Sequence, residues 1–486
     1  MPTDEQKMES PFVPRIINPI RIDHLVVFAG ETLIRSAAKL LVDNMPWIKI
    51  DVCHDPGTAS RFVADGIAVF IFDDTALPLV DTETIRRNNR DAVIVFLSAN
   101  PYIQCSPPGP AAERYPYTAM ADLVFAYDTN DRVPRTVVAP AVRAAEDLIN
   151  IRASSPDVRR SIFLVVDDEP RWLSQFLPVL HKIIAQRAVV MVTRTYEDTL
   201  QFLFAAENES EIEPEVMQSK GQARDVVFLI TDIFFPRGDE PESDAGRDLI
   251  RLVNKYYPRI PIVIASKAEE AEAFIDRAYL LPKGDPGSLQ ELTSHIRDFS
   301  GMGDFLIRNS KGEVLHRIKN IQGLYQLVIK AEKNTQVGHE LRAIIESYAE
   351  KDRFSTWLYM HSYRELGDKL RPRHTRGREL ISLLKEDFGR QIDWLKLTPL
   401  VIDDTSIYSI ADMLHVLRTA GEEAIQPFSD NDVLSSWLDR QGYSELAEEL
   451  RPIHGSGKEL GETLVSVIEK WQGYYEDNDQ TVGPST

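Results

Sequence analysis

The sequence has few cysteines, few basic residues for its acidic content, and no long apolar run. Only Cys53 and Cys105 are present, too few for a disulfide framework or a cysteine metal site. The formal net charge of −20 disfavours a nucleic-acid partner, because lysine and arginine drive binding to the phosphate backbone. No stretch has the roughly 18–20 apolar residues of a membrane helix, and we find no secretory-signal pattern. We therefore expect a soluble cytoplasmic protein.

A chain of 486 residues is too long for one hydrophobic core, so several domains are expected. Residues 1–20 are polar and contain several prolines, which predicts a flexible lead-in. Residues 476–486 are predicted to be a disordered tail.

Between residues 21 and 152, apolar runs alternate with segments of helical pattern. The runs are apolar on both faces, which predicts a parallel sheet with helices on both sides, including one at Thr32–Asp43. The predicted strands are His24–Phe28, Ile48–Val52, Ala68–Phe72, Ala92–Leu97 and Asp122–Tyr127.

The same pattern restarts after the break at Ser154–Pro156 and fills residues 158–300. Acidic stretches at Glu207–Glu215 and Gly238–Asp244 are interpreted as surface insertions. The predicted strands are Ser161–Val166, Val189–Thr193, Asp225–Thr231, Pro261–Ala265 and Ala278–Leu281.

Polar side chains follow several strands of this second domain at the points where the strands end. The carboxyl ends of parallel strands meet at one edge of the sheet, where α/β folds bind ligands. We therefore expect three carboxylates, a hydroxyl and an ammonium to share one pocket. They belong to Asp167, Asp168, Asp232, Ser266 and Lys283.

This set of groups suits Mg²⁺ and a phosphoryl group. A carboxylate attacks phosphorus only if the charge of the donor oxygens is offset, and a divalent metal with oxygen ligands does that. Asp167, Asp168 and Asp232 could supply the metal ligands. Lys283 could neutralise charge on the transferring group, and Ser266 could hydrogen-bond the product.

The arrangement resembles the receiver domain of bacterial response regulators. Val165-Val166-Asp167-Asp168-Glu169-Pro170 is similar to the family's acidic pair, and Asp232 with Pro236 four residues later is similar to its phosphoacceptor motif. The resemblance implies that Asp232 is the phosphoacceptor, with Lys283 and Ser266 as the family's lysine and switch hydroxyl. It also implies that the backbone carbonyl of Phe234 completes the metal site, and that the strand order is 2-1-3-4-5.

Two positions depart from the family pattern. Leu280 stands where the family has an aromatic residue, and Gly284 replaces the proline that follows the lysine. Tyr279 is adjacent to Leu280 but should face the other way along a strand. In the family, movement of the switch hydroxyl is coupled to movement of the aromatic residue. The departures put this coupling in doubt at Ser266, but not the phosphorylation itself.

The first domain resembles an inactive copy, a pseudo-receiver. Aligning Val69–Asp74 with Val227–Asp232 places Asp74 over the phosphoacceptor and Ser98 near the switch position. However, Ala29-Gly30 replaces the acidic pair and the last strand offers no lysine. We expect protein contact rather than phosphorylation here, and a flavodoxin-like domain of other ancestry is the alternative. The predicted fold class is α/β, with two flavodoxin-like five-stranded domains followed by a mainly helical tandem repeat.

The helical region contains an internal repeat at an offset of 80 residues. Phe354-Ser355-Thr356-Trp357-Leu358 recurs as Leu434-Ser435-Ser436-Trp437-Leu438. We expect one module at residues 302–395 and another at 396–475. Short extended pieces, at Asp304–Ile307 and Pro399–Asp403, should precede the helices, and both tryptophans are predicted to be core anchors. The modules resemble those attached to receiver-like domains in proteins related to phosphoenolpyruvate synthase.

His316 is a further candidate. Leu315-His316-Arg317-Ile318-Lys319-Asn320 resembles the phosphorylated-histidine box of sensor kinases, at a predicted helix start, but no Gly-rich ATP-binding sequence follows. We therefore expect a response-regulator-type signalling protein that is not a stand-alone enzyme. A histidine kinase or phosphotransfer protein would phosphorylate Asp232, and output would be through an unidentified protein partner, with a homodimer plausible. The alternatives are a phosphorelay intermediate that uses His316 and a constitutive scaffold with a vestigial receiver.

Overall fold

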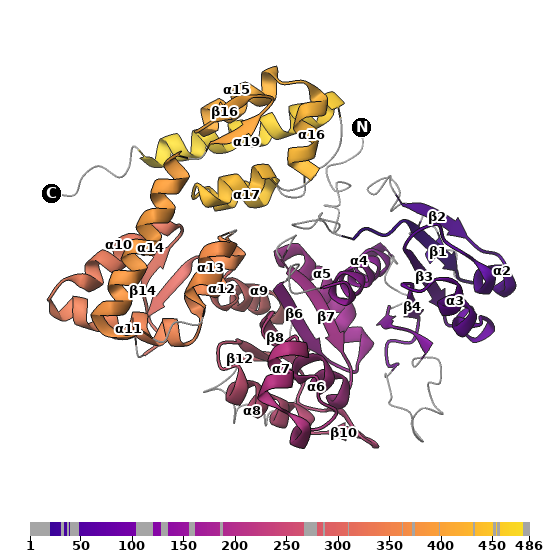
Figure 1. Ribbon diagram of the computed structural model, residues 1–486. Coiled ribbons are helices and arrows are strands. Elements are labelled where there is room, and N and C mark those ends of the chain that lie inside the picture. Colours follow the sequence, from indigo (N-terminus) through magenta and orange to yellow (C-terminus); the bar gives the residue numbers. More distant parts are fainter. Residues whose placement is uncertain are drawn as a thin grey trace. The chain divides into compact units, whose positions relative to one another are not determined.

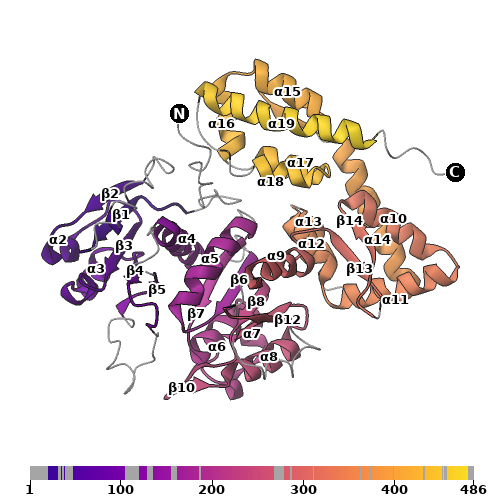
Figure 2. The same ribbon diagram turned by 180° about the vertical axis from the view of Figure 1, so that it is seen from behind.

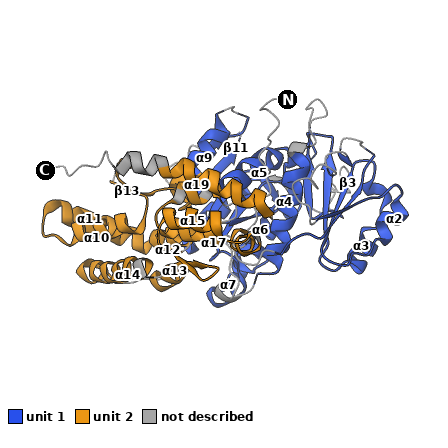
Figure 3. Ribbon diagram, turned by 90° about the horizontal axis from the view of Figure 1, so that it is seen from above, with its two compact units in different colours: residues 1–12, 19–295 blue, residues 13–18, 296–486 orange. Residues whose placement is uncertain are grey.

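The computed structural model divides the chain into two compact units, one ending at His295 and the other continuing from Ile296 (Figure 3). The structure describes residues 20–30, 34–35, 38, 48–103, 120–127, 135–154, 161–184, 188–266, 279–284, 287–309, 311–361, 363–371, 375–397, 399–430, 433–450, 453 and 457–479. The predicted lead-in, most of the helix predicted at Thr32–Asp43 and most of the predicted tail lie outside these residues. No helix in the described part is long and apolar enough to cross a bilayer.

The first unit contains two five-stranded parallel sheets, each with the strand order 2-1-3-4-5 (Figure 1). This is the flavodoxin-like order, in which ligands bind at the carboxyl ends of the strands. In the first sheet the order is β2 (Lys49–Val52), β1 (His24–Phe28), β3 (Ala68–Asp73), β4 (Val93–Ser98) and β5 (Leu123–Ala126). In the second it is β7 (Ala188–Thr193), β6 (Ser161–Val166), β8 (Val226–Thr231), β11 (Ile262–Ser266) and β12 (Tyr279–Pro282).

Most of the central strands form because their residues are apolar and are buried on both faces of the sheet, whereas the edge strands β2 and β12 are partly exposed. β3, β4 and β8 are buried along their whole length. The helices and 3-10 turns that can be delimited within the described residues of the first domain are α2 (Pro56–Arg61), η2 (Leu77–Leu79), α3 (Thr82–Asn88) and α4 (Arg135–Arg152). Within the described residues, those of the second domain are α5 (Pro170–Ile184), α6 (Tyr196–Phe204), η5 (Glu209–Glu211), α7 (Pro214–Lys220), α8 (Ala245–Tyr256) and α9 (Ser288–Phe299).

Helix α4 belongs to the first domain in sequence but packs against both domains. It contacts β4 and β5 of its own sheet, and also α5 and β7 of the second domain (Figure 2). A buried ionic cluster lies at this contact. The Asp147 carboxylate is 3.7 Å from Arg143 Nε and 3.0 Å from His181 Nε2, and it accepts a 3.0 Å hydrogen bond from the Val190 N–H. The three side chains are fully buried, so this contact is a fixed part of the unit.

The predicted insertion at Gly238–Asp244 is part of a β-hairpin. β9 (Phe235–Arg237) pairs antiparallel with β10 (Glu240–Ser243) between the end of β8 and the start of α8. Arg237 fixes the hairpin to the domain through ion pairs with Asp248 at 2.7 Å and Glu209 at 2.9 Å, and its guanidinium lies over the Tyr196 ring. The predicted Glu207–Glu215 insertion holds η5 and the start of α7.

The second unit contains two modules of the same design, each a β-hairpin followed by five helices. Helices α12 to α14 recur at an offset of 80 residues as α17 to α19. The first module has β13 (Phe305–Arg308), β14 (Val314–Ile318), α10 (Ile321–Glu332), α11 (Gln336–Glu350), α12 (Arg353–Met360), α13 (Arg364–Leu370) and α14 (Gly377–Leu397). The second has β15 (Leu400–Ile402), β16 (Thr405–Ile407), α15 (Ile410–Thr419), α16 (Glu422–Asp430), α17 (Val433–Arg440), α18 (Ser444–Leu450) and α19 (Gly457–Asp479).

The predicted extended pieces are the first strands of these two hairpins, and both tryptophans belong to the module cores as predicted. Trp357 is 1% exposed and Trp437 is 9% exposed. The Trp357 indole N–H donates a 3.0 Å hydrogen bond to the Gly303 carbonyl.

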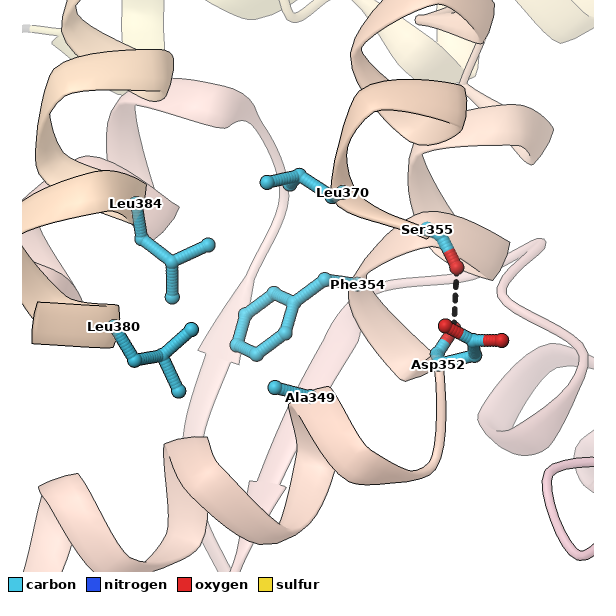
Figure 4. Close-up of a pocket in the computed structure, with 7 residues that line it drawn as sticks. All are labelled: Ala349, Asp352, Phe354, Ser355, Leu370, Leu380 and Leu384. Atoms are coloured by element: carbon cyan, nitrogen blue, oxygen red, sulfur yellow. Dashed lines mark hydrogen bonds between the residues drawn. The ribbon is translucent and has the colours of Figure 1, made fainter. Parts of the chain in front are cut away.

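A pocket in the first module is lined mainly by core residues (Figure 4). Its lining residues are Ala349, Asp352, Phe354, Ser355, Leu370, Leu380 and Leu384. The Phe354 ring points toward the two leucines of α14, and the Ser355 hydroxyl donates to the Asp352 carbonyl at 2.9 Å. The pocket is therefore a gap in the packing of α11 to α14.

Candidate functional site

The predicted site residues of the second domain meet at the carboxyl edge of its sheet. Asp167 and Asp168 follow β6, Asp232 follows β8, Ser266 ends β11 and Lys283 follows β12. The strand pairing brings them level. The Asp232 N–H donates to the Val166 carbonyl at 3.0 Å, and the Lys283 N–H donates to the Ser266 carbonyl at 3.2 Å.

Lys283 joins two of the acids. Its ammonium lies 2.6 Å from Asp167 Oδ2 and forms a second ion pair with Asp232. The lysine side chain is 1% exposed. Burial alone would lower the pKa of Lys283, but the carboxylates of Asp167 and Asp232 outweigh that effect and raise it. The ammonium is therefore held charged inside the site.

Negative charge is in excess at this edge. Burial, with the neighbouring Asp167 carboxylate as a second cause, raises the pKa of Asp168 to about 8. Burial also raises the pKa of Asp167 to about 6, although the Lys283 ammonium opposes the shift. One ammonium would not balance the three acids if all were ionised, so a second cation would be bound favourably here and would favour their ionised forms.

The donor chemistry fits a hard cation such as Mg²⁺, because carboxylate oxygens are its preferred ligands. Asp167, Asp168 and Asp232 supply such oxygens next to one another in the sheet edge. Within the described residues, no group of three or more acidic, histidine or cysteine side chains already has a geometry that could hold a metal. In the structure the Lys283 ammonium pairs with two of the three acids.

The other predicted site residues occupy their expected elements. Ser266 is buried at the end of β11, and Phe234 is 37% exposed in the segment between β8 and the hairpin. Pro236 lies inside β9, so the residue matched to the family's proline belongs to a hairpin. Leu280 packs on the core, whereas the Tyr279 ring stacks on His295 at 4.9 Å. The two neighbours on β12 therefore have different surroundings, as expected for a strand.

Trp172 was not identified from the sequence, although it lies beside the site. It stands in the first turn of α5, four residues after Asp168, and its ring centroid is 5.6 Å from the Lys283 ammonium. The sequence feature that could have indicated its place beside the site is its position shortly after the acidic pair Asp167-Asp168. A buried aromatic residue in a helix is usually assigned to the core, so that signal is weak.

The first domain has different groups at the equivalent edge. In the first sheet, Asp73 pairs with Leu97, the residue before Ser98. In the second sheet, Thr231 pairs with Ile264, so Asp232 is level with the residue before Ser266. This register places Asp73, not the predicted Asp74, at the position of Asp232. The apolar runs alone do not fix this position, because Ala68–Asp73 and Val226–Thr231 are both six-residue strands and the aspartate is the last residue of one but follows the other.

Both aspartates of the first domain are occupied by local hydrogen bonds. Asp73 accepts from the Thr75 and Ala76 N–H groups, and Asp74 accepts from the Ser98 hydroxyl at 2.7 Å and from the Ala99 N–H at 2.6 Å. Tyr127 stands at the lysine position, because its N–H donates to the Ser98 carbonyl as that of Lys283 does to Ser266. The equivalent edge of the first domain therefore differs in its groups from the edge of the second, and the absence of phosphorylation there stays a prediction.

His316 is not at a helix start, so that prediction was wrong. It lies in β14 opposite Ile307, and α10 begins at Ile321, capped by the Asn320 side chain. Burial, with a contribution from Lys330, lowers the pKa of His316. Val314–Ile318 instead pairs antiparallel with β13 as the second strand of a hairpin.

Comparison with known proteins adds a likeness of fold. No family model matches the chain, and no curated protein is significantly similar to it. One similar solved structure, a putative two-component system response regulator/GGDEF domain protein, is 15% identical and matches 56% of this chain and 97% of its own, with a TM-score of 0.26. The E. coli RcsC C-terminus, with its linker region and phosphoreceiver domain, is 11% identical, with coverages of 57% and 93% and a TM-score of 0.21. At such TM-scores the likeness carries no argument, and the function is argued from the site alone.

Proposed function

We propose that the chain is a signalling protein of the response-regulator class, phosphorylated on Asp232 with Mg²⁺ bound by the neighbouring acids. The observation that carries this proposal is the buried Lys283 ammonium between Asp167 and Asp232, with Asp168 alongside. An isolated set of charged strand ends would instead point to solvent.

Each residue has a role in the proposed step. An Asp232 carboxylate oxygen attacks the phosphorus of a phosphodonor, a new O–P bond forms, and the bond from phosphorus to the donor's leaving group breaks. Lys283 stabilises charge on the transferring group, and Ser266 donates a hydrogen bond to it. Mg²⁺ would be held by Asp167, Asp168 and Asp232, with the Phe234 carbonyl, and would offset the charge of the donor oxygens.

The donor would be a histidine kinase, a phosphotransfer protein or a small phosphate ester or anhydride. Output would be protein–protein contact, because an acidic chain of net charge −20 is a poor ligand for nucleic acid. The chain would not be a stand-alone enzyme, since the domain would act only on its own aspartate.

Labelling with acetyl phosphate tests the proposal. The full chain is incubated with acetyl phosphate and Mg²⁺ and run on a phosphate-affinity gel, beside Asp232→Asn and the control Asp74→Asn. We expect a shifted band in the wild type and in Asp74→Asn, and none in Asp232→Asn or with EDTA. No labelling in the wild type would overturn the proposal and favour a constitutive scaffold.

A further inference from the structure

Trp172 forms one wall of the lysine's surroundings. The Lys283 ammonium lies over its indole ring, 5.6 Å from the centroid, within the range of a cation–π contact. Gly284 is next to the same ring, since a Cβ built on it would lie 3.8 Å from Trp172 Cη2. The tryptophan is 7% exposed. Its environment therefore depends on where the ammonium is.

Trp172 is also the first member of a stack that reaches the first domain. The Arg171 guanidinium lies 4.9 Å from the Trp172 ring centroid and 5.4 Å from the Tyr102 ring centroid. Glu169 fixes both neighbours, because its Oε2 accepts from Arg171 Nε at 3.0 Å and from the Trp172 indole N–H. Tyr102 follows β4 of the first domain, four residues after Ser98.

Phosphorylation would disturb the start of this stack. Lys283 is paired with Asp167 and Asp232, so a phosphoryl group on Asp232 would offer it new oxygens. A shift of the ammonium changes its interaction with the indole, because a cation–π contact depends on the position of the charge over the ring. The indole is tied to Arg171 by a shared carboxylate, so the guanidinium would respond.

We propose that Trp172 is a positioning residue that senses Lys283 and, through Arg171, passes the state of Asp232 to Tyr102 in the first domain. Trp172 would do the work of the aromatic residue that the receiver family has at the position of Leu280. This inference rests on the proposed function, since it needs a phosphoryl group on Asp232. The first domain then receives the signal through a contact that is present before phosphorylation.

Hydrogen–deuterium exchange tests the stack. The full chain is measured with and without Mg²⁺ and beryllium fluoride, a phosphoryl analogue, and the backbone amides within residues 98–103 are followed, apart from Pro101, which has none. In the wild type we expect a roughly threefold change in exchange rate, the size expected from one cation–π contact. Arg171→Gln and Tyr102→Ala should abolish this change while acetyl-phosphate labelling of Asp232 persists, because neither side chain touches Asp232 or Lys283.

Arg194→Gln is the matched control. Arg194 is another arginine of the second domain that contacts the first, with its guanidinium 3.3 Å from the Ala121 carbonyl, but it is not in the stack. Its variant should keep the change in exchange. An unchanged response in Arg171→Gln, or labelling in the wild type without any response at residues 98–103, overturns the inference and leaves the proposed function standing. If labelling itself is absent from the wild type, the proposed function fails first.

Discussion

Lys283 and Asp167 form a buried ion pair, with Nζ 2.6 Å from Oδ2 and both side chains at most 2% exposed. Burial of such a pair is favourable only when the geometry is good and further partners are present. Here the ammonium also pairs with Asp232, and Asp167 Oδ1 accepts the Glu169 N–H at 3.0 Å. The lysine is therefore fixed by the acids that it is proposed to assist.

Replacing Lys283 with methionine should reduce labelling of Asp232 by about 100-fold or more, the usual cost of removing one preorganised group that stabilises the transition state. The measurement is the initial rate of labelling by acetyl phosphate. Lys220→Met, at the exposed end of α7, is the control and should label normally. A rate within twofold of the wild type for Lys283→Met would contradict the role given to this lysine.

Asp168→Asn should stabilise the metal-free protein at neutral and alkaline pH. The folded-state pKa of Asp168, about 8, lies above its ordinary value of 3.8, so the folded state prefers the protonated form. The stability of the wild type should therefore fall as the pH rises from about 4 to about 8. Asparagine does not titrate at this position, so the free energy of unfolding of the variant should depend less on pH. At pH 8 it should exceed that of the wild type by on the order of 1–4 kcal/mol.

Urea unfolding in EDTA across this pH range checks the expectation for Asp168. Glu291→Gln, on the exposed side of α9, controls for the loss of one negative charge. Equal pH profiles for the wild type and Asp168→Asn would show that the pKa of Asp168 is not raised in the folded protein.

Asp147→Leu should destabilise the first unit by about 3–5 kcal/mol, because it leaves Arg143 and His181 buried without their carboxylate. Urea unfolding followed by circular dichroism measures this. Arg251→Ala removes an exposed ion pair with Asp248 and should cost at most about 1 kcal/mol. Similar losses in the two variants would mean that the buried cluster does not hold α4 to α5 and β7.

Trp357→Ala should destabilise the second unit by about 3–5 kcal/mol, since it removes a buried aromatic side chain and its hydrogen bond to Gly303. Trp394 is 44% exposed on α14 and provides the matched control. Its replacement by alanine should cost about 1 kcal/mol or less, even though the Arg440 guanidinium lies over its ring. The midpoint of thermal unfolding, followed by near-ultraviolet circular dichroism, compares the two.

Much of the α/β architecture could be predicted because most of its strands are short apolar runs. Ser161–Val166 and His24–Phe28 match the observed strands residue for residue, and the others differ by one or two residues at their ends. The polar residues of the site could be found because parallel strands align their carboxyl ends. These are consequences of local pattern and simple topology.

Contacts between distant helices could not be predicted in the same way. Arg143, Asp147 and His181 are polar residues in amphipathic helices, and such residues usually face solvent. Their burial depends on α4 packing against a second domain, which no local pattern encodes. The hairpin β9–β10 was missed because its strands are only three and four residues long and each contains a proline, which is uncommon inside strands.

The dual packing of α4 changes where this chain can be divided. A receiver fragment that starts at the Ser154–Pro156 break would lose α4, and with it the partners of His181 and the cover of α5 and β7. The break separates the two α/β domains along the sequence. The packed unit extends across the break, because α4 contacts α5 and β7. A truncated domain would therefore lose intrinsic structural support, and it would be a poor substitute for the longer chain in signalling assays.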